Sequence, residues 1–195
     1  MQVPTLSGLT KADQEALWEC CPHMSNHVPA KLSLCVGMPV MIRNNEATEL
    51  CVTKGQEAVV VGWDVSDGPY DRQVLETLFV QLINPPKDVQ LADLPMNVIP
   101  LTKTMSSIQC KARSDQLLQI KRHQVPVLLN FAMTDYASQG KTRKYNVVDL
   151  GYSRDHQSYY TALSRSSSAA GTVLIQNFSI HKITCGISGW LRQEF

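Results

Sequence analysis

The sequence has no long apolar run, no paired-cysteine motif and little charge for its length. No apolar stretch approaches the roughly 18–20 residues that a membrane helix needs, and the start MQVPTLSGLTKADQ has neither the charged nor the apolar region of a secretion signal. We therefore expect an intracellular protein without a membrane segment. The six cysteines lack C-x-x-C spacing, so we expect reduced thiols. Apolar residues make up 44% and charged residues 18% of the 195 residues, which excludes the composition of a disordered chain.

Positive charge is concentrated in the second half of the chain. Residues 1–100 carry 6 Lys and Arg against 12 Asp and Glu, whereas residues 101–195 carry 12 against 5. A basic bias of this kind is typical of chains that bind nucleic acid or phosphate, and a solvated basic face produces the same bias. Charge alone leaves both interpretations open.

Changes in hydrophobic pattern divide the chain into three segments. In the first, the spacing over 9–20 predicts a short helix, and the apolar runs 32–36 and 39–42 predict a strand or two. In the second, turn signals separate short strands, an arrangement typical of a small antiparallel β-barrel. These strands are predicted over 57–65, 74–83, 98–101, 108–112 and 117–121.

The third segment, from residue 125, has a different pattern. The runs 125–133, 145–150 and 172–178 are apolar on successive residues, which is typical of strands buried on both faces. Residues 155–168 fit one helix between the last two runs, with Tyr159 and Tyr160 near its buried side. This alternation predicts a parallel α/β sheet.

The sequence lacks a phosphate-binding loop. Gly140-Lys141-Thr142 has the form of the end of such a loop, which also needs a glycine where this chain has Asp135. No other segment supplies the pattern. We therefore expect that the chain by itself cannot hold the triphosphate of ATP with its Mg²⁺.

Four segments, taken in order, carry a stronger signal than any one of them. They are VGMPVMIRNN at 36–45, RHQVP at 122–126, TDYASQGKT at 134–142 and YTALSR at 160–165. In this order they resemble four motifs of Pif-like superfamily-one DNA helicases: the G-x-x-V-M-x-x-x-N strand, the R-x-Q-x-P segment before motif V, motif V itself and motif VI. The sequence of the first motif and the residues after it is most similar to that of helicases carried by Helitron mobile elements. The resemblance covers most of the chain.

The resemblance implies an α/β fold: the RecA-like parallel sheet of the second helicase domain, with an inserted small β-barrel. It places the first part of that domain at 1–54, the insert at 55–124 and the remainder, with motifs V and VI, at 125–195. The implied function is that of the C-terminal portion of an ATP-dependent 5′ to 3′ DNA helicase. ATP and Mg²⁺ would be held by a first RecA-like domain that this sequence does not contain, so we expect no ATP hydrolysis by the chain alone.

The family's site residues map onto both motifs. Arg165 matches the arginine finger that reaches the γ-phosphate, a role that suits a planar and permanently charged guanidinium. Gln139 and Gly140 match positions on the nucleotide side. The alternative for Arg165 is that it ends a helix or pairs with a carboxylate.

Further positions match contacts to single-stranded DNA, the expected partner. Thr134 and Ser138 match contacts to backbone phosphates, and Tyr136 stacks on a base or packs in the fold. Arg43 and Asn44 follow the early strand and are weaker candidates. Arg122 lines the DNA channel or, alternatively, anchors the barrel to the sheet.

Two other groups of residues have weaker signals. Cys20, Cys21, His23 and His27 offer zinc-ligand types in a spacing that matches no known finger, so we expect no metal site. Asp149 and Asp155 are more consistent with a strand end and a helix cap than with catalysis. The rival function is a non-catalytic nucleic-acid-binding module or a truncated mobile-element relic. The family resemblance implies the nucleus and roles in DNA repair, recombination and telomere maintenance.

Overall fold

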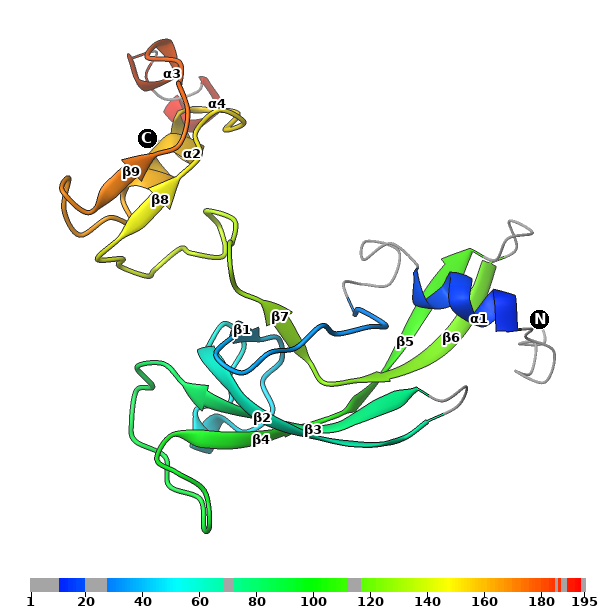
Figure 1. Ribbon diagram of the computed structural model, residues 1–195. Helices are drawn as coiled ribbons and strands as arrows, with labels where there is room; N and C mark the ends of the chain where they lie inside the picture. Colours follow the sequence, from blue (N-terminus) through cyan, green and yellow to red (C-terminus); the bar gives the residue numbers. More distant parts are fainter. Residues whose placement is uncertain are drawn as a thin grey trace. The chain divides into compact units, whose positions relative to one another are not determined.

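The computed structural model describes residues 11–19, 28–68, 72–111, 117–184, 186 and 189–193. They form two compact units, which divide between Phe131 and Ala132. No helix in these ranges is long and apolar enough to cross a membrane. The elements in chain order (Figure 1) are α1 (Lys11–Trp18), β1 (Pro39–Ile42), η2 (Thr48–Leu50), β2 (Glu57–Asp67), β3 (Gln73–Leu82), β4 (Val98–Thr102), β5 (Thr104–Lys111), β6 (Leu117–Gln124), β7 (Val127–Leu129), β8 (Asn146–Val148), α2 (His156–Leu163), β9 (Thr172–Leu174), α3 (His181–Thr184) and α4 (Gly189–Arg192).

A five-stranded antiparallel sheet, in the order β4-β3-β2-β1-β7, is the centre of the first unit. Side chains alternate along its strands, so that Leu78 and Val80 of β3 are buried while Gln81 is exposed. This alternation builds an apolar core on one face. The core also contains Val40, Ile42, Ala58, Val60, Ile99, Leu101 and Val127.

The β2–β3 pair continues past the core as a long hairpin (Figure 1). Its register shifts between Val60 and Gly62 and again between Asp64 and Val65. Bulges of this kind bend a strand and increase its twist. Beyond the first shift, Trp63 is 38% exposed although it lies within a strand. β5 and β6 form a separate two-stranded sheet, and α1 lies against it.

The predicted strands over 57–124 are confirmed as β2 to β6, but their assembly differs from the prediction. β2, β3 and β4 belong to the open five-stranded sheet, and neither sheet closes on itself in the described part of the chain. The predicted small barrel is therefore not confirmed. β1 and β7 join the same sheet as β2, so this sheet runs across residues 55 and 125, where the sequence placed the limits of the insert.

Two expectations from apolar runs are wrong. The run 125–133 is not a buried parallel strand: β7 is short, lies at the sheet edge and pairs antiparallel with β1. Residues 125–127 are buried, but Leu129 and Phe131 are exposed. Residues 32–36 form no strand. Leu32 and Leu34 pack against the core without a strand partner.

The second unit contains a parallel pair, β8 and β9, in the register Val147↔Val173. α2 connects the two strands and packs on one face, where Tyr159 contacts a cluster that includes Val148 and Leu150. The rings of Tyr159 and Phe178 meet edge to face with centroids 6.1 Å apart. The predicted strand–helix–strand order is confirmed here, with two parallel strands in the described residues. The expected burial of these strands on both faces is wrong, because Val147 and Val173 are exposed.

Candidate nucleotide and nucleic-acid interface

The motif V segment forms a turn that Thr134 opens. The Thr134 hydroxyl accepts a hydrogen bond from the Ala137 N–H at 3.2 Å, and its carbonyl accepts one from the Ser138 N–H at 3.1 Å. A hydroxyl that accepts from a backbone N–H three residues on is the bonding of a helix cap. Gly140 ends the turn with φ +80°, a conformation that favours glycine. The segment then runs into β8 instead of a helix, unlike a phosphate-binding loop.

Most of the predicted contact residues of this turn are accessible. Thr134, Gln139 and Gly140 are exposed, and Tyr136 is 67% exposed. The packing alternative for Tyr136 therefore does not describe this structure, and its ring face is available for a base. Ser138 is buried. Thr134 is consequently the more accessible of the two hydroxyl groups that match phosphate contacts.

α2 carries the first part of motif VI, and Asp155 is its N-cap residue. The Asp155 carboxylate accepts hydrogen bonds from the backbone N–H and the hydroxyl of Ser158, both at 2.8 Å. These bonds, the backbone one first, hold the pKa of Asp155 below its ordinary value. The prediction that Asp155 is a helix cap is confirmed. Tyr159 is buried as predicted, but Tyr160 is exposed, because its position one residue on faces away from the β8–β9 pair.

Replacing Asp155 with alanine should destabilise the second unit by about 1 kcal/mol at neutral pH, because α2 loses its capping acceptor. The folded-state pKa lies below the ordinary value of 3.8, so the ionised carboxylate stabilises the fold above that pH. This contribution is lost as the pH falls through the folded-state pKa. Urea unfolding at neutral and strongly acidic pH measures both effects. Asp155→Asn keeps a capping oxygen without the charge, and an Ala variant equally destabilised at both pH values contradicts the assignment.

Arg165 lies next to Ser164, the C-cap residue of α2, and neutral acceptors hold its guanidinium. Its Nε donates to the Thr161 carbonyl at 3.1 Å, and its Nη2 donates to the Ser164 hydroxyl at 2.7 Å. Within the described residues Arg165 forms no ion pair. The alternative that it pairs with a carboxylate therefore does not describe this structure, whereas the alternative that it ends a helix does, because its side chain bonds the last turn of α2. A guanidinium held by neutral groups retains its full charge for an anionic ligand.

Main-chain hydrogen bonds join the end of motif V to the end of motif VI. The Arg143 N–H donates to the Arg165 carbonyl at 2.7 Å, and the Ser167 N–H donates to the Arg143 carbonyl at 2.9 Å. The Asn146 side chain adds bonds to the Ala162 carbonyl and the Ser166 hydroxyl. We call this set of contacts the motif junction. Sequence reasoning missed Arg143, because a main-chain bond leaves no requirement on the type of side chain.

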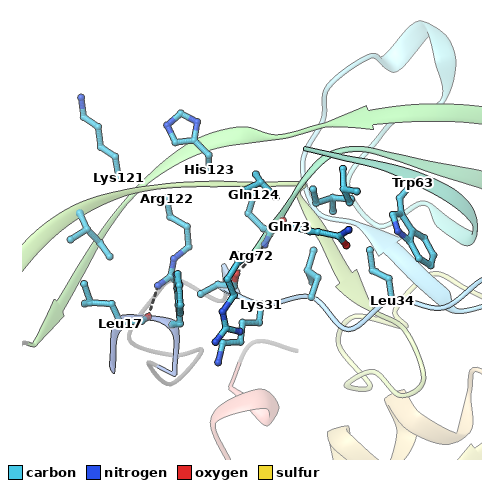
Figure 2. A pocket seen from close by; sticks show the side chains of 17 residues that line it. Leu17, Lys31, Leu34, Trp63, Arg72, Gln73, Lys121, Arg122, His123 and Gln124 are labelled. Atoms are coloured by element: carbon cyan, nitrogen blue, oxygen red, sulfur yellow. Dashed lines mark hydrogen bonds between the residues drawn. The ribbon is translucent and has the colours of Figure 1, made fainter. Parts of the chain in front are cut away.

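The remaining predicted contacts lie in the first unit. Arg43 and Asn44 follow β1, with Arg43 half-buried and Asn44 exposed. Arg122 is 9% exposed, and its guanidinium donates to the Val28 carbonyl at 2.7 Å and to the Leu17 carbonyl at 2.9 Å. Figure 2 shows the bond to Leu17. Arg122 is thus an anchor, the second alternative, but it anchors α1 and the segment after it to β6.

The structure describes one of the two remaining groups of residues from the sequence analysis, that of Asp149 and Asp155, and not the cysteine and histidine group. Asp149 follows β8 and accepts hydrogen bonds from the Gly151 N–H and the Gln176 side chain, as expected of a residue at a strand end. The cysteine and histidine group that the sequence analysis weighed as a zinc site lies outside the described residues. The described residues contain no group of three or more His, Cys, Asp or Glu that could hold a metal ion.

Comparisons with known proteins find similarity at the level of structure. No protein-family model and no curated protein sequence matches the chain. The Pif1 helicase from Bacteroides in complex with ADP-AlF3 and ssDNA matches with a TM-score of 0.59 and 18% identity over 87% of this chain. The Pif1 helicase from Candida albicans matches with a TM-score of 0.60 and 19% identity over 96% of this chain. The chain has the fold of Pif1 helicases.

The match covers most of this chain but less than half of each Pif1 chain. The chain spans 35% of the Bacteroides Pif1 chain and 40% of the Candida Pif1 chain. A structure of two coordinating Pif1 helicases at forked dsDNA gives the same result, with a TM-score of 0.59 and 41% of that chain covered. The shared fold agrees with the RecA-like fold that the four sequence motifs predict.

Proposed function

We propose that this chain is the C-terminal portion of a Pif1-like, ATP-dependent DNA helicase of the Helitron type, which moves 5′ to 3′ along single-stranded DNA. The proposal rests on the motif junction, because its hydrogen bonds join the end of motif V to the end of motif VI within one unit. Motif V offers an exposed turn that can contact nucleotide and DNA, and motif VI offers Arg165, which can bind a phosphate. The Bacteroides Pif1 neighbour was solved with ADP-AlF3 and ssDNA, which supports both ligand classes.

In this proposal the chain supplies one side of a shared nucleotide site. Bound ATP with Mg²⁺ supplies the phosphoryl group that is transferred to water. Arg165 binds the developing charge on that group, while Gln139 and Gly140 contact the nucleotide from the motif V turn. The neutral partners of Arg165 and the exposure of Gln139 fit such a ligand. The sequence lacks a phosphate-binding loop, so we expect no hydrolysis without a first RecA-like domain.

A bare sheet face supports the need for a further polypeptide. α2 covers one face of β8 and β9, and on the other face the register partners Val147 and Val173 are 64% and 54% exposed. Parallel strands are usually covered on both faces. We expect other parts of the helicase to bury this apolar face.

The DNA side of the proposal rests on the exposed motif V turn. The exposed Thr134 hydroxyl suits a backbone phosphate and the exposed Tyr136 ring suits a base, so binding should be independent of sequence. Asn44 and Arg43, which lie in the first unit, are proposed as separate and weaker DNA contacts. Ser138 contributes through the turn that its backbone closes.

Replacing Tyr136 with leucine should weaken binding of oligo-dT to the chain about tenfold, because one base loses its stacking partner. Fluorescence anisotropy with labelled oligo-dT at two salt concentrations measures this, and added salt should weaken binding by all variants.

Tyr152→Leu is the matched control, since Tyr152 is an exposed tyrosine of the same unit outside both motifs. Equal losses in the two variants would point to non-specific contact. Tight, salt-insensitive binding of one duplex sequence would contradict the proposal. Binding without any gain in ATP hydrolysis from an added first domain would favour a non-catalytic module.

A further inference from the structure

The first unit contains a groove of about 640 Å³ that includes no motif V or motif VI residue. Four segments line it: the end of α1, residues 30–34, the β2–β3 hairpin and residues 120–124 of β6 (Figure 2). The groove exists because the two register shifts in β2 bend the hairpin past the core, while Arg122 fixes α1 opposite it.

The groove collects positive charge in an otherwise acidic unit. Residues 1–131 carry 11 Lys and Arg against 13 Asp and Glu. Lys31, Arg72, Lys121 and Arg122 nevertheless line the groove, and none of its described lining residues is Asp or Glu. Figure 2 shows Lys121 pointing to the other side of β6, and Arg122 is bonded to carbonyls. Lys31 and Arg72 are therefore the cations that a ligand in the groove would meet.

Both cations are positioned by an aromatic ring. The Arg72 guanidinium lies 4.9 Å from the centre of the Trp18 ring, and the Lys31 ammonium lies 6.0 Å from it. Lys31 is also 3.7 Å from the Glu19 carboxylate, an exposed pair of the kind that contributes little to stability. The Trp18 ring thus holds two cations at one end of the groove.

Trp63 provides a second ring, at the end of the groove near Leu34 (Figure 2). It is partly exposed within β2, where a tryptophan is more often buried. Gln73, an exposed amide, also lines the groove and can exchange hydrogen bonds with a polar ligand. The groove therefore offers charge, a polar group and a flat apolar face together.

We infer that this groove binds a single-stranded nucleic acid, with phosphates against Lys31 and Arg72 and a base stacked on Trp63. A nucleic acid strand supplies both negative charge and flat rings, which is the combination the groove matches. An acidic peptide supplies only the charge and would leave Trp63 without a role. The groove adds a second strand contact to the proposed function and shares no residue with the motif V turn.

Anisotropy titrations of the full chain with labelled oligo-dT, with oligo-U of equal length to separate DNA from RNA, test the inference. Trp63→Leu should weaken binding by about fivefold to a hundredfold through lost stacking. Lys31→Gln and Arg72→Gln should each lower the slope of log Kd against log salt by about 0.7. Trp190→Leu and Lys87→Gln, exposed positions outside the groove, should leave both quantities unchanged. Circular dichroism verifies that each variant is folded.

The outcomes separate this inference from the proposed function. If the groove variants bind like the wild type while Tyr136→Leu binds weakly, the groove inference is wrong and the motif V contact stands. If only the groove variants bind weakly, the groove inference stands and the motif V contact fails. Competition by poly-glutamate as strong as that by unlabelled oligo-dT would overturn the choice of nucleic acid. A folded wild-type chain that binds neither oligo-dT nor oligo-U overturns both.

Discussion

Replacing Arg165 with alanine should lower ATP hydrolysis by about 10³-fold to 10⁵-fold in an assembly of this chain with a first RecA-like domain. The guanidinium stabilises charge that develops on the transferred phosphoryl group, and alanine leaves no donor in its place. The measurement is steady-state hydrolysis by the chain fused to the first RecA-like domain of a Pif1 helicase, with the unfused chain alongside. The unfused chain should hydrolyse no ATP.

Two matched variants make this result specific. Arg165→Lys keeps the charge but loses the planar fork, so it should recover only part of the rate. Arg154→Ala removes an exposed arginine of the same unit outside both motifs and should leave the rate unchanged. Hydrolysis by the unfused chain, or a fusion whose rate is indifferent to Arg165→Ala, would contradict the shared-site proposal.

The elements that the sequence predicted well are those with local signals. The helix of α2 begins where Asp155 caps it, and the predicted strands over 57–65 and 74–83 form β2 and β3. The pairing of strands could not be predicted from such local signals. β1 and β7 lie far apart in the chain, and no local pattern states that Ile42 pairs with Val127. An apolar run indicates a strand, but it does not distinguish an edge strand from a central one.

In the candidate site, too, some features could be predicted from the sequence and others could not. Arg165, Gln139 and Tyr136 could be predicted because motif spacing ties side-chain type to position. The motif junction could not, because the bonds of Arg143 and Ser167 are main-chain bonds. The groove could not either. Trp18, Lys31, Trp63 and Arg72 come from separate segments, and only the fold brings them to one place.

Replacing Arg122 with methionine should lower the free energy of unfolding by about 2–4 kcal/mol. Methionine keeps an apolar stem but removes the donors to the Leu17 and Val28 carbonyls, and a buried carbonyl without a donor costs about 1–3 kcal/mol. Urea unfolding measures the loss. Hydrogen exchange should show faster exchange in α1, which the guanidinium holds against β6.

The neighbouring residue supplies the control, and the result decides between the two roles considered for Arg122. Lys121→Met changes an exposed side chain on the same strand, so it should alter the free energy of unfolding by less than about 0.5 kcal/mol. A DNA contact at Arg122 would give the opposite outcome: unchanged unfolding with weaker binding of oligo-dT. An anchor predicts loss of stability first, with loss of binding following from it. Because Arg122 fixes the end of α1 that carries Trp18, releasing it should also open one wall of the groove.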